Sequence, residues 1–247
     1  HEIYSALGFE KQDWPLLAVL LPYTLLIMLS SYSICRAMVM PASFLVVLFY
    51  AIYLVVRNGV ISYQKASGLA MFSGIVIFCF YSFIRLKEML PVEEYGYDAI
   101  FFILLILCFA WGGDTCAYFA GRAFGKHKLC PVVSPKKTVE GAVGGVLGTM
   151  VFGVLVTVIY SIAADRMEEF TRSNIGVSMY VIIALLACVA AVLGIYGDLF
   201  ASVVKRQCGI KDYGTIFPGH GGILDRFDSV MFIAPFVTMV VIAAFYN

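Results

Sequence analysis

A loop rich in glycine and charged residues near the C-terminal end is the strongest candidate for chemistry. It reads Lys211-Asp212-Tyr213-Gly214, then Pro218-Gly219-His220-Gly221-Gly222, then Asp225-Arg226-Phe227-Asp228. Carboxylate oxygens are the hard ligands that Mg²⁺ prefers, and Lys and Arg complement phosphate oxygens. Glycine-rich backbone can turn its N–H groups toward an anion. Together these groups supply what phosphoryl or nucleotidyl transfer requires. His220 is either a structural hydrogen-bonding group or an acid or base.

Two aspartates lie near the ends of long apolar segments. Burying an ionisable group at membrane depth costs free energy, so such a residue is a candidate for a functional role. Asp198 is followed by Ser202, Lys205 and Arg206, at helical spacings that place all four on one face. Asp114 is related in the same way to Tyr118. Extension toward the membrane surface would explain the lysine or the arginine alone, but an aspartate is too short to reach far. We therefore expect functional roles for both aspartates.

A second polar loop, at 121–140, is rich in lysine. It contains Lys126, Lys128, the run Ser134-Pro135-Lys136-Lys137-Thr138, and Glu140. A cytoplasmic orientation signal would account for the lysines, but not for the ordered run that leads to Glu140. We expect this run to open a helix, whose N-terminus attracts phosphate.

The rest of the chain must hold these groups in a membrane. Of its 247 residues 62% are hydrophobic and 13% are charged, whereas soluble domains are about a quarter charged. Seven apolar runs are long enough to span a bilayer as helices; they lie at roughly 14–33, 37–56, 66–84, 98–120, 141–163, 177–203 and 228–246. The predicted fold is an all-α, polytopic integral membrane protein with about seven transmembrane helices. Residues 1–97 form a plain three-span region, and residues 98–247 form the catalytic region with both polar loops.

Charge placement predicts the orientation. The two polar loops, 121–140 and 204–227, hold 9 of the 17 basic residues, so both are expected to face the cytoplasm. Four glycines, at 141, 144, 145 and 148, form overlapping GxxxG patterns and predict close helix packing. The seven cysteines show no CxxC spacing, which indicates neither disulfides nor a zinc site. No cleavable signal peptide is evident, and the start at His1 suggests that the natural beginning is missing.

The motifs resemble those of the phosphatidate cytidylyltransferase (CDP-diacylglycerol synthase) family. The resemblance rests on Ser202 with Lys205-Arg206, on Lys211-Asp212, and on Pro218-Gly219-His220-Gly221-Gly222 followed by Asp225-Arg226-Phe227-Asp228. It extends to Gly197-Asp198, to Asp114 with Tyr118, and to Lys128 and the run Ser134 to Glu140. Motifs of the family cover about 98–247, and residues 1–97 are similar only in hydropathy.

This resemblance implies that CTP and phosphatidate are converted to CDP-diacylglycerol and pyrophosphate by a metal-dependent nucleotidyltransferase of phospholipid biosynthesis. Asp198 and Asp225 match metal positions, for Mg²⁺ with room for a second cation. The implied catalytic residues are Asp198, Lys211, Asp212, His220, Asp225, Arg226 and Asp228. The implied substrate-binding residues are Asp114, Tyr118, Lys128, Ser134, Lys136, Lys137, Thr138, Glu140, Ser202, Lys205 and Arg206. The expected setting is a bacterial inner membrane, with the active site facing the cytoplasm.

Two other functions stay open at this point. A CTP-dependent polyprenol or lipid kinase would transfer the γ-phosphoryl group to an alcohol and release CDP. A transporter would carry charged residues through several spans, whereas here they gather at the ends of two, which favours an enzyme. The expected partners are CTP, phosphatidic acid and the lipid bilayer, with no nucleic acid. A homodimer is one of the oligomeric states that the sequence allows.

Overall fold

The computed structural model describes residues 1–166, 176–216 and 221–245. The chain forms two compact units, each built from segments that are distant in the sequence. Unit 1 comprises His1–Ile84 and Gln207–Arg226, and unit 2 comprises Arg85–Arg206 and Phe227–Asn247. The division expected at residue 97 separates a plain membrane region from a catalytic region. The two compact units do not test it, so it stays a prediction.

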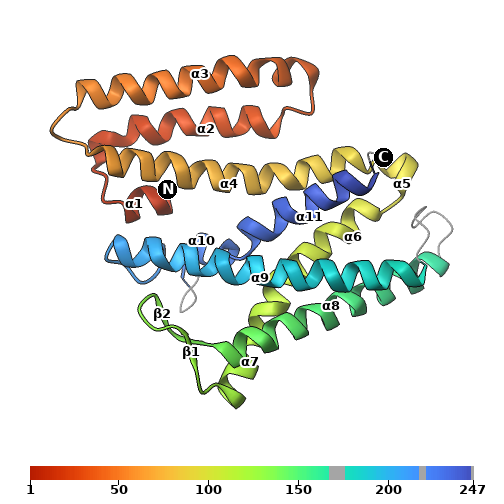
Figure 1. Cartoon of the computed structure of the whole chain (residues 1–247). Coiled ribbons are helices and arrows are strands. Elements are labelled where there is room, and N and C mark those ends of the chain that lie inside the picture. The colour runs from red at the N-terminus through yellow and green to blue at the C-terminus, as the bar shows by residue number, and fades with distance from the viewer. Residues whose placement is uncertain (167–175, 217–220, 246–247) are drawn as a thin grey trace. The chain divides into compact units, whose positions relative to one another are not determined.

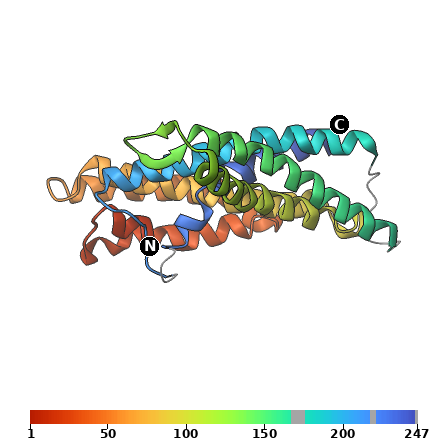
Figure 2. The same cartoon turned by 90° about the horizontal axis from the view of Figure 1, so that it is seen from below.

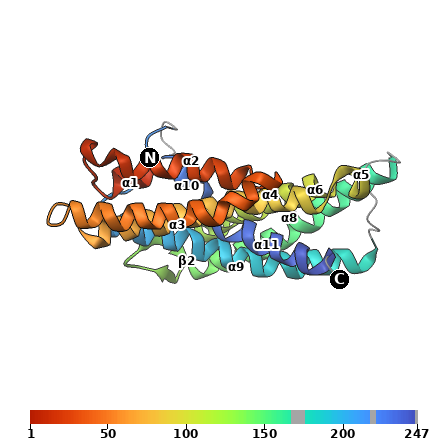
Figure 3. The same ribbon diagram turned by 90° about the horizontal axis from the view of Figure 1, so that it is seen from above.

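Unit 1 is a small group of helices with one polar loop. Its helices are α1 (Glu2–Ala6), the 3₁₀ turn η1 (Lys11–Asp13), α2 (Trp14–Met28), α3 (Ser33–Val56) and most of α4 (Tyr63–Met89). Helices α2 and α3 lie side by side (Figures 1 and 3). Tyr50 Oη donates to the Leu16 carbonyl at 3.1 Å, and the hydroxyls of Tyr23 and Ser43 are 2.9 Å apart. These polar links pin α2 to α3 where apolar surface alone would leave them free to slide.

A buried ion pair closes one end of this helix pair. Asp13 is buried, and its Oδ1 lies 3.1 Å from Arg57 Nη2 just beyond α3. Tyr53 Oη donates to the same oxygen at 3.2 Å. Because a buried carboxylate is costly without such partners, these contacts fix the start of α2 against the end of α3.

Unit 2 holds the remaining helices. They are α5 (Val92–Tyr95), α6 (Asp98–Leu107), the π-helical turn η2 (Cys108–Gly112), α7 (Gly113–Phe124), α8 (Val139–Arg166), α9 (Val177–Gln207) and α11 (Val230–Phe245). The short α10 (Leu224–Phe227) bridges the boundary between the units in the sequence. Helix α6, η2 and α7 form one continuous apolar stretch from Asp98 to Phe124, and Asp114 lies in the first turn of α7, directly after η2. π-Helical turns inside helices are frequent at functional sites.

Small residues join α7 to α8, as the GxxxG pattern predicts. A β-carbon on Gly145 would lie 3.0 Å from the Ala117 β-carbon, and one on Gly141 would lie 2.9 Å from the Ala117 carbonyl oxygen. A β-carbon on Gly144 would overlap that of Ala120. The expected packing role of these glycines is therefore confirmed. It brings the backbones of α7 and α8 close enough to hold the polar loop between them.

That loop, which connects α7 to α8 in the sequence, is an antiparallel hairpin of β1 (Lys128–Cys130) and β2 (Ser134–Thr138), drawn in light green in Figure 2. Two details of the sequence-based interpretation change here. The fold is mostly helical rather than purely α, and the run from Ser134 to Thr138 is a strand that precedes the helix. Helix α8 begins only at Val139 because Thr138 caps it: its Oγ1 accepts the Gly141 N–H at 3.1 Å.

Within the described residues, five helices rather than seven are long and apolar enough to cross a membrane. They are Ser33–Val56, Tyr63–Met89, Asp98–Phe124, Val139–Ala164 and Val177–Gln207. The first and last predicted spans are wrong because α2 has 15 residues and α11 has 16, and a span needs about 20. The turn at residues 29–32 ends the first run after α2, and the turn at Asp228 and Ser229 uses up the start of the last run before α11. The protein is a polytopic integral membrane protein.

Candidate active site

Asp198, on α9, is the best-connected of the predicted site residues in unit 2. Lys137, at the end of the hairpin, forms an ion pair with Asp198 Oδ2. Ser202 lies one turn further along α9, and its hydroxyl donates to Asp198 Oδ1 at 3.3 Å. Both oxygens of this half-exposed carboxylate therefore meet a polar partner. The contact with Lys137 joins the lysine-rich loop to the helix whose aspartate the sequence singled out.

Two further carboxylates lie near Asp198. Asp228 is buried in the turn before α11, and its Oδ1 accepts the Ser229 N–H at 2.8 Å. Burial first, and then the charges of Asp198 and Asp114, raise the pKa of Asp228 above its usual value. Asp114 Oδ2 accepts a hydrogen bond from Ser229 Oγ at 3.1 Å. Unit 2 thus brings together three aspartates from α7, α9 and the turn before α11.

Glycine makes this approach feasible. A β-carbon on Gly197 would lie 2.5 Å from the Asp228 carbonyl oxygen, so any larger residue would push the turn away from α9. Gly194 has the same role a turn earlier, where a β-carbon would lie 2.9 Å from Ile233 of α11. The proximity of Asp198 and Asp228, which the sequence did not predict, therefore depends on two small residues of α9.

The cations at the end of α9 differ in their surroundings. Lys205 is buried, with 8% of its surface exposed, and its positive charge acts to lower the pKa of Asp228. Arg206 is exposed. Lys205 therefore lies with the cluster of Asp114, Asp198 and Asp228, whereas Arg206 is accessible to a ligand that approaches this cluster from outside.

The hairpin residues fall into two groups. Lys128 and Lys136 are exposed, while Ser134 is partly covered and Thr138 is the buried cap of α8. Glu140 binds its own loop: it accepts the N–H groups of Lys126 at 3.0 Å and His127 at 3.2 Å, and meets His127 Nδ1 at 2.6 Å. Glu140 thus shapes the loop. Tyr118 is exposed, with its hydroxyl 3.5 Å from Arg122 Nη1.

The remaining predicted residues belong to the loop of unit 1. Asp225 Oδ2 accepts the N–H groups of Tyr213 at 2.8 Å and Gly222 at 2.9 Å, which folds the loop back on itself. Gly221 has a φ of 84°, and a β-carbon there would lie 2.8 Å from Asp225 Oδ2. Tyr213 is buried, its ring 5.7 Å from that of Phe72 on α4. The loop is therefore built around the Asp225 carboxylate.

The other residues of this loop that the sequence predicts to be catalytic have different surroundings. Lys211 and Asp212 are exposed. Arg226 follows Asp225 in α10. His220 lies outside the described residues.

The donor atoms suit a hard divalent cation. Among residues 1–166, 176–216 and 221–245, no three carboxylate, imidazole or thiolate side chains form a ready-made metal cage. Mg²⁺ does not need one in this chemistry, since it keeps several waters and is held by one or two carboxylates together with substrate phosphates. Asp198, with Asp228 and Asp114 nearby, offers that kind of donor set.

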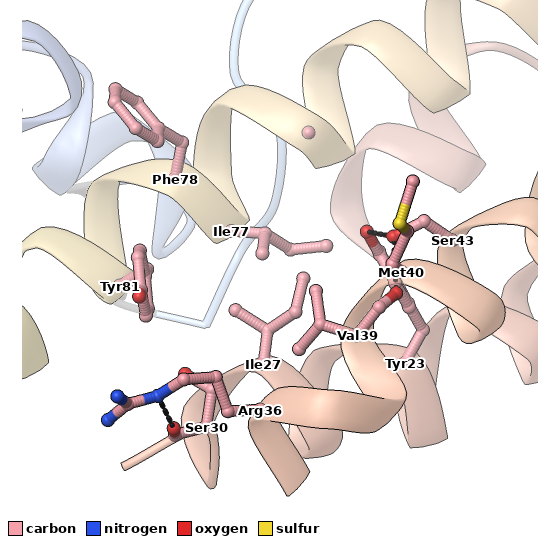
Figure 4. A pocket seen from close by; sticks show the side chains of 11 residues that line it. Tyr23, Ile27, Ser30, Arg36, Val39, Met40, Ser43, Ile77, Phe78 and Tyr81 are labelled. Atoms are coloured by element: carbon pink, nitrogen blue, oxygen red, sulfur yellow. Dashed lines mark hydrogen bonds between the residues drawn. The ribbon is translucent and has the colours of Figure 1, made fainter. Parts of the chain in front are cut away.

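A cavity in unit 1 has a different character. It measures about 620 Å³ and lies among α2, α3 and α4 (Figure 4). Ile27, Val39 and Ile77 supply apolar walls, and Arg36 points its Nε at the Ser30 carbonyl, 3.2 Å away. None of the predicted site residues lines it. The cavity is therefore separate from the candidate chemistry.

Two residues of the site were missed by the sequence interpretation. Ser229 links Asp114 to the turn that holds Asp228, and its position directly after the last motif residue was the available signal. Glu2 accepts hydrogen bonds from Ile223 and Leu224. More than 200 positions separate it from them, so no local pattern could have shown the contact.

The chain is similar to known proteins over most of its length. A model of the cytidylyltransferase family matches residues 1–244. The phosphatidate cytidylyltransferase of Bacillus subtilis is 32% identical over 191 residues, which are 77% of this chain and 64% of the relative. Those of Staphylococcus haemolyticus and Staphylococcus epidermidis are 39% and 42% identical over 145 residues, 59% of this chain and 50% of each relative. The chain spans half to about two thirds of the length of these relatives, and it belongs to the cytidylyltransferase family.

Proposed function

We propose that the protein is a phosphatidate cytidylyltransferase, which converts CTP and phosphatidate to CDP-diacylglycerol and pyrophosphate. The single observation that supports this most is the group formed by Asp198, Asp228 and Asp114 with Lys137 and Lys205 in one unit. It combines metal-binding oxygens with phosphate-binding cations in a membrane protein of this family. The names of the relatives add the substrate class.

The chemistry requires two anions to meet. An oxygen of the lipid phosphate attacks the α-phosphorus of CTP, a P–O bond forms, and the bond to the departing pyrophosphate breaks. A phosphate monoester is already largely ionised near neutral pH, so no general base is needed to activate it. The work of the protein is to offset repulsion and to hold the reactants in line. Of the two cations expected to bind the lipid phosphate, Arg206 is exposed and would make the first contact, and Lys205 is buried beside the aspartates. Lys136 and Lys137 suit the triphosphate.

Mg²⁺ would supply charge neutralisation at the phosphates, with room for a second cation. Asp198 and Asp225 are the ligands proposed from the sequence. The neighbourhood of Asp198 adds Asp228 as a candidate. Asp225 already uses one oxygen to fold its own loop. Its carboxylate would therefore bind metal from a position set by the loop backbone, with little freedom to move.

We further propose that loops 121–140 and 204–227 face the cytoplasm of a bacterial cell, at the inner membrane. Their basic residues support this orientation, and CTP is supplied from that side. The protein would act either alone or as a homodimer.

One assay tests the proposal against its rival. Purified protein is incubated with Mg²⁺, phosphatidate, a polyprenol as the alcohol acceptor, and CTP labelled either in the cytidine or at the γ-phosphate. A cytidylyltransferase moves the cytidine label into the lipid extract and the γ-label into pyrophosphate. A CTP-dependent lipid kinase would move the γ-label into the lipid and leave CDP in the water phase, which would overturn the proposal.

A further inference from the structure

The carboxylate of Glu2, near the start of the sequence, contacts the loop 204–227, here called the catalytic loop. Its Oε1 accepts the Ile223 N–H at 2.8 Å, and its Oε2 accepts the Leu224 N–H at 2.8 Å. Those two residues stand directly before Asp225 and Arg226. Both ends of the contact belong to unit 1. One side chain thus holds two successive peptide groups of the loop.

The loop is shaped to admit this carboxylate. A β-carbon on Gly222 would lie 2.5 Å from Glu2 Oε1, and one on Gly214 would lie 2.8 Å from the same oxygen. The two glycines also face each other, because a β-carbon on Gly214 would lie 3.2 Å from the Gly222 α-carbon. Glycine at both positions therefore has a local physical reason: it leaves room for the Glu2 side chain.

The helix that carries Glu2 is anchored in turn. Ile3 and Tyr4 of α1 are buried, and Tyr4 Oη donates to the Glu10 carbonyl at 2.5 Å. Lys65 Nζ on α4 donates to the Gly8 carbonyl at 3.2 Å. Glu2 therefore projects from a supported segment, and its contact with the loop is not that of a freely moving terminal side chain.

We propose that Glu2 is a positioning residue for the catalytic loop. The Asp225 carboxylate accepts a hydrogen bond from the Gly222 N–H. The Glu2 carboxylate accepts hydrogen bonds from the next two N–H groups, those of Ile223 and Leu224. Three successive amides are thus fixed by two carboxylates, which sets the direction in which Asp225 and Arg226 leave the backbone. The inference rests on the proposed function, since it assigns the loop to the cytidylyl transfer.

The test uses the full-length chain and the isosteric variant Glu2→Gln. An amide keeps one acceptor but turns an NH₂ group toward one of the two N–H donors, so one hydrogen bond is lost and one repulsion is introduced. We expect kcat to fall at least about tenfold, with the KM values for CTP and phosphatidate changed by less than about threefold. Glu2→Asp keeps both acceptors and should recover part of the loss. Glu93→Gln, which changes an exposed glutamate of α5, is the matched control.

A second variant disturbs the same contact while Glu2 itself stays unchanged. Gly214→Ala places a methyl group 2.8 Å from the present position of Glu2 Oε1, so the carboxylate has to move away. It should reproduce the loss of kcat seen with Glu2→Gln. Combining the two changes should cost little more than either alone, because each removes the same interaction.

Hydrogen exchange of the 221–226 segment gives a readout that is independent of activity. The amides of Ile223 and Leu224 should exchange faster in Glu2→Gln than in the unchanged protein or in Glu93→Gln. Unaltered exchange would overturn the contact itself. Faster exchange with unchanged kcat would overturn the positioning role. Failure of the unchanged protein to form CDP-diacylglycerol would instead reject the proposed function, and the exchange result would still decide whether Glu2 holds the loop.

Discussion

Lys137 and Asp198 form an ion pair that ties the end of the β-hairpin to the middle of the candidate active site. Lys137 lies in a strand of the lysine-rich loop, and Asp198 lies on α9, 61 positions later. The pair gives Asp198 a cationic partner that offsets the negative charges of Asp228 and Asp114. It also places the lysine where it can meet a phosphate and the aspartate together.

The first prediction concerns this pair. Lys137→Ala should lower kcat/KM by roughly 10- to 150-fold, the equivalent of about 1.5–3 kcal/mol for a lost charge-assisted hydrogen bond. Lys126→Ala, in the same loop, should have little effect because its side chain is exposed and only its backbone N–H is bound by Glu140. Steady-state kinetics on both variants provides the measurement. Equal losses in the two would show that only the overall charge of the loop matters.

Metal binding leads to the second prediction. Asp198→Asn and Asp225→Asn should each abolish turnover, because an amide oxygen is a far weaker ligand for Mg²⁺ than a carboxylate. Both proteins should remain folded and extractable, as judged by size-exclusion chromatography in detergent. Turnover is then measured across a Mg²⁺ titration. Near-normal activity of either variant at any Mg²⁺ concentration would exclude that residue as a direct ligand.

The third prediction separates the two substrates. Arg206→Ala should raise the KM for phosphatidate at saturating CTP, because Arg206 is exposed at the end of a membrane helix. Lys136→Ala and Lys137→Ala should raise the KM for CTP at saturating phosphatidate, since the hairpin lies in the aqueous loop. The reverse pattern would refute this division of labour. A loss of kcat with both KM values unchanged would point to roles in the transition state.

Helix packing supplies the fourth prediction. Gly144→Ala should destabilise the protein by about 1–3 kcal/mol, because the new methyl group overlaps Ala120 on the adjacent helix. Gly74→Ala makes the same change on α4, where a β-carbon would have no described neighbour within 4 Å. It should be neutral or stabilising by up to about 1 kcal/mol. Thermal unfolding in one detergent compares the two, and an equal fall in Tm would contradict the tight packing of α7 on α8.

The fifth prediction concerns orientation. Single cysteines placed at Lys136 and at Thr215, both exposed, should react with a membrane-impermeant thiol reagent only after the cells are opened. The native cysteines are first replaced by serine in the parent protein. Reaction of either site from outside sealed cells would reverse the proposed topology.

The membrane character, the family and most of the candidate residues follow from the amino-acid sequence alone. Long apolar runs, the order Asp225-Arg226-Phe227-Asp228 and the GxxxG spacing are local properties, and each follows from covalent neighbours. The sequence-based count of seven spans was too high, because hydropathy does not show where in an apolar run the helix begins and ends. Asp13 and Leu29 bound α2, and the turn at Asp228 and Ser229 delays α11.

The partners of these residues could be identified only from the three-dimensional fold. Lys137 meets Asp198, Ser229 meets Asp114, and Glu2 meets Ile223 and Leu224 across 61, 115 and more than 220 positions. Such contacts depend on how helices pack, which is set by glycines such as Gly197 and by the sum of many weak apolar interactions. No periodicity in the chain encodes them, because period and spacing describe one element at a time.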